Sequence, residues 1–444
     1  MRSIPARRPH PALPALAALL LVLPGLACAQ SLRELYEAAR AYDATYLSAR
    51  ALADLAQYRT EQAEALARPS AALSGSASRT QVNLPGGYGN GDQNTVAASV
   101  NGSYTLFNRA NTATIEQARK SLLISQADLE TAEQDLVVRV AQGYFDVLAA
   151  QDALATQQTN KTAVAEQLAS AKRNFEVGTA TITDTREAQA RYDLATAQVL
   201  QAENDLLTKR IALEALVGRQ GITPKPLLVP VVLPSTQPAD AEAWVTTADG
   251  VHPTVRKARL AYDVAQLDIS KARAGRLPTV AAVASVGVNN STGLAVTIPG
   301  ATKSASVGVQ LNWTLFDGGA TQNRIKETLS LEDKARQDLE AARRGVAQGT
   351  RVAYFGVQSG LAQVKALEAA ESSSKLALAA TQLGYKVGVR VNLDVLNSQT
   401  QLYTTQRDLA KARYDVIVGG LKLRQASGAL GLSDVEAVNR LLAK

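Results

Sequence analysis

Hydrophobic residues recur at every seventh position along several long stretches of this chain. In the first stretch they are Leu122, Leu129 and Leu136, and then Val140, Val147 and Leu154. Heptad spacing is typical of helices that pack along a partner over their whole length. It predicts one helix over about 110–175, which at about 1.5 Å per residue would be about 100 Å long. The same spacing runs from Tyr192 to Leu213 and predicts a second helix that ends at Gly218.

Shorter stretches alternate apolar with polar residues, which is the pattern of a β-strand with one apolar face. The clearest places Ala305, Val307, Val309, Leu311, Trp313 and Leu315 on one face and Ser306, Gly308, Gln310, Asn312 and Thr314 on the other. Residues 96–106 alternate in the same way, and weaker partner strands are expected over 71–82 and 280–288. Glycine, asparagine and proline are frequent between the two strands of each pair, which predicts a loop there.

One shorter helix is expected before each pair of strands. The first covers 31–68 and stops at Pro69, because proline cannot continue a helix. The second covers about 241–276 and is interrupted near Pro253. His252 directly precedes this proline, and we expect it to be an ordinary surface residue in a loop.

Each long helix is followed by a short segment that reverses the chain. The segment runs from Phe175 to Asp184 in one case and from Tyr385 to Asp394 in the other, with Val-Gly at the same place in both. Glycine readily takes the left-handed conformation that ends a helix. We expect Thr183 or Asp184, and Asp394, to supply a capping oxygen near the start of the next helix.

All of these elements occur twice, at an offset of 209 or 210 residues. The strand end Tyr104–Phe107, for example, corresponds to Trp313–Phe316. A repeated order at a fixed offset indicates a duplicated structural unit. The expected organisation is a first repeat over 30–218, a proline-rich connector over 219–240, a second repeat over 241–430 and a C-terminal tail over 431–444.

Residues 1–29 have the features of a secretory signal peptide. Three arginines precede an apolar run, and Ala27-Cys28-Ala29 forms a small-residue cleavage site. Lipidation of Cys28 is the alternative. Removal of the three arginines lowers the net charge from +7 to +4 and leaves no cysteine and one histidine, which argues against disulfides, a zinc site or a Ser-His-Asp triad. No remaining segment holds 18 consecutive apolar residues, so no transmembrane helix is expected.

The strand pattern instead indicates a sheet in a membrane, although a sheet packed on the chain's own core is the alternative. The apolar faces end in the aromatic residues Tyr104, Phe107, Trp313 and Phe316, as strands do at a membrane interface. Four strands cannot close a barrel, and an open edge in lipid leaves backbone groups unpaired. Several copies must therefore share one barrel, and we favour three copies because eight strands would leave a lumen filled by side chains. Ser306, Gln310 and Asn312 would then face the lumen.

The duplicated unit, the paired Val-Gly tips and the run from Tyr385 to Ala412 resemble the TolC family of outer membrane channel-tunnels. The resemblance covers about residues 31–430 and is most specific at Asp394–Asn397, followed by Gln401–Tyr403. It implies a mixed α and β fold: a homotrimer with a twelve-stranded transmembrane β-barrel, four strands per protomer, continued by a long periplasmic α-helical coiled-coil tunnel. It also implies the outer membrane of a Gram-negative bacterium, a periplasmic adaptor (membrane fusion protein), and an inner membrane ABC or proton-driven transporter.

The same resemblance implies roles for residues at the two tips. Thr183, Asp184, Tyr385 and Arg390 would form the links that hold the periplasmic mouth closed. Threefold symmetry would bring three copies of Asp394 into an acidic ring that favours cations, and Arg390 could supply counter-charges. The alternative is that these side chains only cap or solvate the helix turns.

Two other classes of function fit the sequence less well. A periplasmic coiled-coil adaptor or structural protein would explain the helices but not the four amphipathic strands. An enzyme could use Asp184 and Asp394 as an acid/base pair, but no His, Cys or glycine-rich loop lies near them. We therefore predict a passive export duct in outer membrane lipid, with no catalytic residue, cofactor, metal or nucleic acid, and we favour type I protein secretion over small-molecule efflux.

Overall fold

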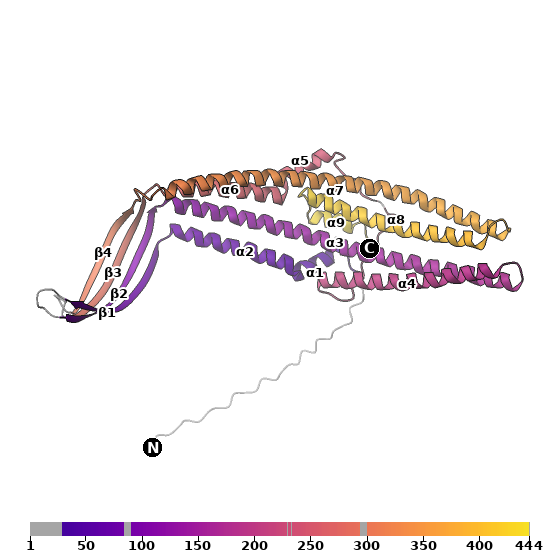
Figure 1. Ribbon diagram of the computed structural model, residues 1–444, viewed down its shortest axis with the longest axis horizontal. Helices are drawn as coiled ribbons and strands as arrows, with labels where there is room; N and C mark the ends of the chain where they lie inside the picture. Colours follow the sequence, from indigo (N-terminus) through magenta and orange to yellow (C-terminus); the bar gives the residue numbers. More distant parts are fainter. Residues whose placement is uncertain (1–28, 84–89, 229, 232, 294–299, 444) are drawn as a thin grey trace, which may run out of the picture.

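The computed structural model describes residues 29–83, 90–228, 230–231, 233–293 and 300–443. The expected signal peptide therefore lies, except for Ala29, outside the described residues. The chain forms a long rod, with a four-stranded sheet at one end and the tips of two helical hairpins at the other (Figure 1). The C-terminus lies near the middle of the rod. None of the described helices combines the length and hydropathy needed to cross a membrane.

The elements occur in two similar series. The first series is α1 Leu32–Tyr42, α2 Ala44–Glu64, the 3₁₀ turn η1 Ala65–Ala67, β1 Ser70–Asn83, β2 Asn90–Phe107, α3 Arg109–Glu176 and α4 Ile182–Val217. The second is α5 Ala241–Val251, α6 Pro253–Ala274, β3 Thr279–Gly293, β4 Gly300–Asn312, α7 Ala320–Lys386 and α8 Asn392–Ala426, and α9 Leu432–Asn439 follows. The long helices predicted from the heptad spacing are confirmed: α3 has 68 residues and α7 has 67. Each is therefore about 100 Å long.

The single helix predicted over 31–68 is wrong, because Asp43 divides it. Asp43 has an extended backbone, and its Oδ1 accepts a hydrogen bond from the Tyr46 backbone N–H at 2.8 Å, which caps the start of α2. Both carboxylate oxygens also accept from the Arg139 guanidinium of α3, each at 2.9 Å. This pairing with Arg139 holds the pKa of the Asp43 carboxyl below its usual range. An N-cap and a two-point ion pair thus fix the break between α1 and α2 against α3.

His252 lies between α5 and α6, as expected, but it is not an ordinary surface residue, because it is the N-cap of α6. Its Nδ1 accepts a hydrogen bond from the Thr254 backbone N–H at 3.1 Å, and Pro253 occupies the first turn of α6. Gly428 packs so closely on this turn that an added Cβ would lie 2.5 Å from the His252 Cα. Burial lowers the pKa of the His252 imidazole, which favours the neutral ring that accepts the capping bond.

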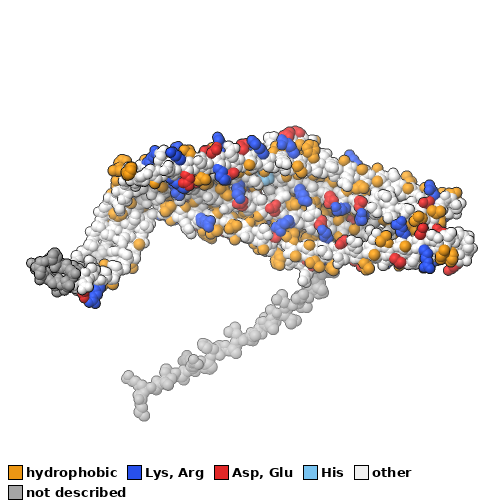
Figure 2. Space-filling model, in the orientation of Figure 1, with side chains coloured by type: hydrophobic (Ala, Val, Ile, Leu, Met, Phe, Trp, Pro, Cys, Tyr) orange, Lys and Arg blue, Asp and Glu red, His pale blue; other side chains and the backbone are white. Residues whose placement is uncertain are grey.

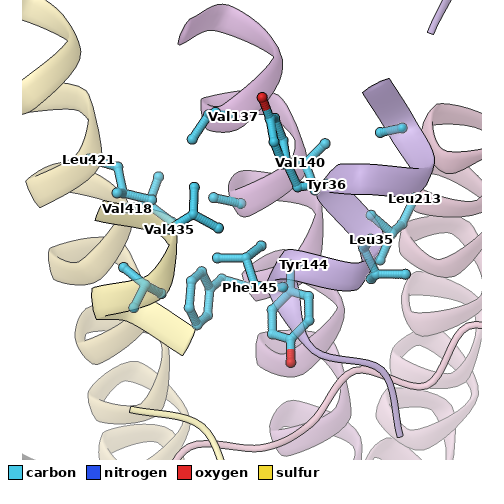
Figure 3. Packing of buried hydrophobic residues seen from close by; sticks show 14 of the residues in the cluster. Leu35, Tyr36, Val137, Val140, Tyr144, Phe145, Leu213, Val418, Leu421 and Val435 are labelled. Atoms are coloured by element: carbon cyan, nitrogen blue, oxygen red, sulfur yellow. The ribbon is translucent and has the colours of Figure 1, made fainter. Parts of the chain in front are cut away.

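The main hydrophobic core lies near α1 and α9, at the middle of the rod (Figure 1). Figure 3 shows how side chains from helices of both series meet there. Leu35 and Tyr36 of α1, Tyr144 and Phe145 of α3 and Val435 of α9 are each at most 2% exposed. The rings of Phe145 and Tyr414 stack with centroids 5.7 Å apart. This core fixes α1, α3, α8 and α9 as one unit, from which the two hairpins extend.

The proline-rich connector and the C-terminal tail both pack against this core. Gln30 forms a parallel bridge with Pro224, and Leu227 forms an antiparallel bridge with Leu442. The Tyr144 hydroxyl donates to the Lys225 carbonyl at 2.9 Å. The predicted tail therefore contains a helix, α9, and its last described residues form part of the fold.

The four strands form one antiparallel sheet in the order β1-β2-β3-β4. The two predicted strand pairs are confirmed, and β2–β3 pairing joins them. The expectation that the last strand continues through Trp313 and Leu315 is wrong, because β4 ends at Asn312, opposite the first residue of β3, Thr279. The chain turns there, and the Trp313 indole N–H donates to the Arg276 carbonyl at 3.1 Å.

Candidate functional site

The two faces of the sheet differ in chemistry, as the alternation predicted. The first, here called the apolar face, includes a row of cross-strand neighbours, one from each strand: Leu73, Val100, Val286 and Ala305. The second, the polar face, is shown by the neighbouring row Ser74, Ser99, Gly287 and Ser304. The apolar face is open: Val307 is 89% exposed and Val309 69%. An apolar surface of this extent on a single chain marks a contact with lipid or with another protein.

Hydroxyl groups link neighbouring strands across the polar face. The Ser74 and Ser99 Oγ atoms lie 2.8 Å apart, and so do those of Ser285 and Ser306. Gln310 and Asn312 follow Ser306 on the same face, because β3 and β4 pair without a register shift. The structure thus brings the three residues predicted to line a lumen to one face of the sheet.

The two hairpin tips have the same backbone geometry. Gly178 and Gly388 have φ values of 77° and 80°, the left-handed conformation that glycine allows. Behind them, the Asn174 carbonyl accepts from two backbone N–H groups of the first tip, and the Gly384 carbonyl accepts from two of the second. Both tips are therefore rigidly defined reversals at the end of the rod opposite the sheet (Figure 1).

In the first tip, the expectation that Asp184 supplies a capping oxygen is confirmed, although the N-cap itself is Thr181 and not Thr183. The Thr181 Oγ1 accepts from the Asp184 backbone N–H at 3.2 Å, and an Asp184 Oδ2 accepts from the Thr181 N–H at 2.9 Å. Asp184 therefore completes a reciprocal capping box three residues into the turn. Its other oxygen, Oδ1, has no hydrogen bond within the described part of the chain, and Thr183 is exposed.

In the second tip, Asp394 does not cap α8. The N-cap is Val391, which has no side-chain acceptor. The Asp394 carboxylate lies instead 3.6 Å from the Arg390 guanidinium, four residues earlier. Arg390 is therefore close enough to Asp394 within one protomer to supply the expected counter-charge.

Polar contacts that the sequence did not reveal join the two hairpins. The Asn174 side-chain amide donates to the Tyr385 hydroxyl at 3.1 Å. The Arg191 guanidinium donates to the Asn397 side-chain carbonyl at 2.9 Å, and Gln167 donates to the buried Asn392. These partners are more than 200 residues apart, and no local pattern marks them.

The expected gate residues all lie at the tips, but one protomer does not bring them into contact with one another. Within the described residues, no hydrogen bond or ion pair joins Asp184 to Tyr385 or to Arg390. Asp184 and Asp394 are each held on their own tip. The described residues also contain no group of three or more His, Cys, Asp or Glu side chains placed to hold a metal ion. The tips offer unused acceptors and donors rather than a completed site.

Comparison with known sequences gives the same picture over nearly the whole chain. The sequence profile of the family described as "Outer membrane efflux protein" matches residues 35–219 and again 244–429. The outer membrane protein TolC of Vibrio cholerae is 34% identical over 93% of each chain. The alkaline protease secretion protein AprF of Pseudomonas aeruginosa is 33% identical over 71% of this chain and 66% of its own.

Solved structures show that the fold is shared as well. A crystal structure of CusC, a protein that forms a transmembrane channel, superposes on this chain with a TM-score of 0.78. The superposition covers 90% of this chain and 92% of CusC, at 18% identity. The outer membrane protein VceC of Vibrio cholerae superposes with a TM-score of 0.76 at 20% identity, over 89% and 96% of the two chains.

Proposed function

Because the chain belongs to the outer membrane efflux protein family, the family of TolC, we propose that it is the export duct of a tripartite system. Like its relatives in this family, the protein is an outer membrane channel and not an enzyme. In the proposed system, cargo passes without further energy input through this duct to the outside. An inner membrane ABC or proton-driven transporter and a periplasmic adaptor deliver the cargo.

The observation that carries this proposal is the pair of open edges of the sheet. β1 and β4 each have a partner on one side only, within the described chain. In a membrane each unpaired backbone group costs several kcal/mol. Identical copies remove both edges if β4 of one pairs with β1 of the next. Three copies give a twelve-stranded barrel, whereas two would give an eight-stranded barrel filled by side chains.

The position of the helical rod at one end of the sheet supports one direction for the duct. The strand ends that join the long helices face the periplasm, and the β1–β2 and β3–β4 turns face the outside. The polar face of the sheet, with Ser306, Gln310 and Asn312, lines the lumen, and the apolar face meets lipid. The two hairpin tips form the periplasmic mouth.

We assign the gate at that mouth to Thr183, Asp184, Tyr385 and Arg390. Within the described ranges, Asp184 retains a carboxylate oxygen without a hydrogen bond. The Tyr385 hydroxyl accepts from Asn174 and so keeps its own proton to donate. Arg390 has further N–H donors beyond its one contact with Asp394. Charge-assisted bonds between neighbouring copies are thus chemically available.

Around the axis of the trimer, three copies of Asp394 would form the acidic ring. The negative charge of each Asp394 is only partly neutralised by Arg390 of the same copy, because the two groups are 3.6 Å apart and both side chains are exposed to solvent. The ring would therefore still attract cations to the mouth.

Type I protein secretion is the branch that we favour. The alkaline protease secretion protein AprF is 33% identical to this chain, whereas the probable efflux pump outer membrane protein TtgC of Pseudomonas putida is 26% identical. This pair of identities is the reason for the preference, while the secretion protein PrtF and the efflux protein BepC are both 27% identical to this chain. A protein cargo would enter through a mouth that has to open widely.

Native mass spectrometry of the detergent-solubilised protein tests the assembly that this function requires. We expect a mass of three copies, because three is the number that closes a barrel with an open lumen. A monomer or a dimer under conditions that keep the protein folded would contradict the proposal.

A further inference from the structure

Charged side chains are confined to one end of the sheet. In the strands and their loops, residues 70–107 and 279–312, the charged residues are Arg79, Asp92 and Lys303. All three lie near the β1–β2 and β3–β4 turns. On the side shown in Figure 2, charged side chains on the sheet gather beside the grey loops, whereas the helices carry both charges along their length.

The register places these charges on the apolar face. Residues separated by an even number of positions lie on the same face of a strand. Arg79 is six positions after Leu73 on β1, and Lys303 is two positions before Ala305 on β4. Asp92 follows the same parity on β2 and forms an ion pair with Arg79. From Leu311 to Lys303 the strand is about 26 Å long. At the tilt of about 35–45° in outer membrane barrels this covers about 20 Å along the membrane normal, most of their apolar band of about 25 Å. The cations thus lie where the apolar surface ends.

The two cations occupy opposite edges of the sheet. Arg79 is on β1 and Lys303 is on β4, with two strands between them in one protomer. In the proposed ring, β4 of one copy lies beside β1 of the next, and neighbouring strands are about 4.8 Å apart. In the ring, with the register that pairs Arg79 with Lys303, each junction between copies brings these two cations together on the lipid side, at the outer end.

Neither cation is fully neutralised. The Arg79 side chain is 72% exposed, and one of its terminal nitrogens contacts Asp92, so other donors of its planar fork are free. Lys303 has no acidic partner among the described residues, and the loops over 84–89 and 294–299 contain no charged residue. The three side chains leave a net charge of +1 at each junction.

We infer that each junction between copies is a binding site for the phosphate of an outer-leaflet lipid, formed by Lys303 of one copy and Arg79 of the next. This inference rests on the proposed ring. An Arg fork and a Lys ammonium are the side chains that hold phosphate oxygens. The apolar band directly below them, with Val286, Ala305 and Val307, would contact the acyl chains. A phosphorylated glycolipid would satisfy both parts of the surface.

Native mass spectrometry with added lipid tests this site. The trimer would be mixed, in detergent, with a phosphorylated glucosamine-disaccharide lipid or with the same lipid after enzymatic removal of its phosphates. We expect up to three phosphorylated lipids to be retained per trimer, at least five-fold more than the dephosphorylated form, and fewer as salt is raised. Equal retention of both lipids by the wild-type trimer would overturn the inference without any mutation.

Variants locate the site. Arg79→Gln with Lys303→Gln should reduce retention of the phosphorylated lipid to the level of the dephosphorylated one, whereas Lys334→Gln with Arg336→Gln, on exposed positions of α7, should not. Asp92→Asn should raise retention, because it frees Arg79. The mass and conductance of each variant show that it has assembled. Assembled trimers whose retention is unchanged by Arg79→Gln with Lys303→Gln would refute the lipid site alone, and failure of the wild type to form trimers would refute the proposed ring.

Discussion

Channels that carry Asp184→Ala, Tyr385→Phe and Arg390→Ser together should conduct several-fold more current than the wild type in planar lipid bilayers. The closed mouth is the narrowest part of a duct about 100 Å long, and resistances in series are dominated by the narrowest one. The three substitutions remove the acceptor and both donors that we assign to links between neighbouring tips. Tyr385→Phe also removes the bond from Asn174.

Two controls separate gating from local damage. Thr181→Ala removes the cap that Asp184 supports but keeps the Asp184 carboxylate, so it should leave the conductance near that of the wild type. Asp394→Ala should lower the preference for cations and the block by multivalent cations, with a smaller change in conductance. If the triple variant conducts like the wild type, the tips do not form the gate, and our assignment of these residues is wrong.

Arginine at Val309 should prevent or strongly weaken membrane assembly, whereas arginine at the adjacent Gln310 should be tolerated. Val309 is on the apolar face and 69% exposed in the protomer, and arginine facing lipid near the midplane costs about 2–4 kcal/mol. In a ring of three copies this cost is paid three times. Gln310 is on the polar face, where an arginine would sit in water and shift the ion selectivity toward anions.

The comparison is matched, because both variants add the same side chain at neighbouring positions of one strand. The yield of folded trimer in the outer membrane, measured by gel after mild solubilisation, reports the first effect, and reversal potentials in asymmetric salt report the second. Equal loss of trimer for both variants would show that the faces of the sheet are not divided between lipid and lumen as proposed.

The sequence predicted the elements that depend on periodicity. The heptad spacing gave both long helices, and the alternation gave the four strands and their faces, because one buried or membrane-facing side selects residues at a fixed spacing. The tips were also predictable: glycine at 178 and 388 is required by the positive φ that each turn adopts.

What could not be predicted depends on contacts between distant residues. The break at Asp43 has no proline or glycine to mark it, and it is fixed by Arg139, 96 residues later. Helix caps were displaced by a few residues, to Thr181 and Val391, because several polar residues near each tip are plausible caps. The bond between Asn174 and Tyr385 exists only because the duplicated hairpins lie side by side.

The most direct test of the account is cross-linking of the two sheet edges between copies. The expected mature chain contains no cysteine, so engineered thiols have no competitors. Ala72→Cys on β1 would be paired in turn with Ser306→Cys, Gly308→Cys and Gln310→Cys on β4, which cover neighbouring positions of the polar face. The register that pairs Arg79 with Lys303 places Gln310 opposite Ala72. Within one protomer these edges are three strand spacings, about 14 Å, apart, which is too far for a disulfide.

The variants would be oxidised mildly in the outer membrane, and denaturing gel electrophoresis would then show how many copies are joined by disulfides. For at least one pairing we predict bands of one, two and three covalently joined copies and none larger, since β4 of each copy meets β1 of the next and the ring closes at three. Each single-cysteine variant should remain monomeric. Absence of joined copies in all pairings, a series that stops at two, or one that continues beyond three would contradict a closed ring of three protomers.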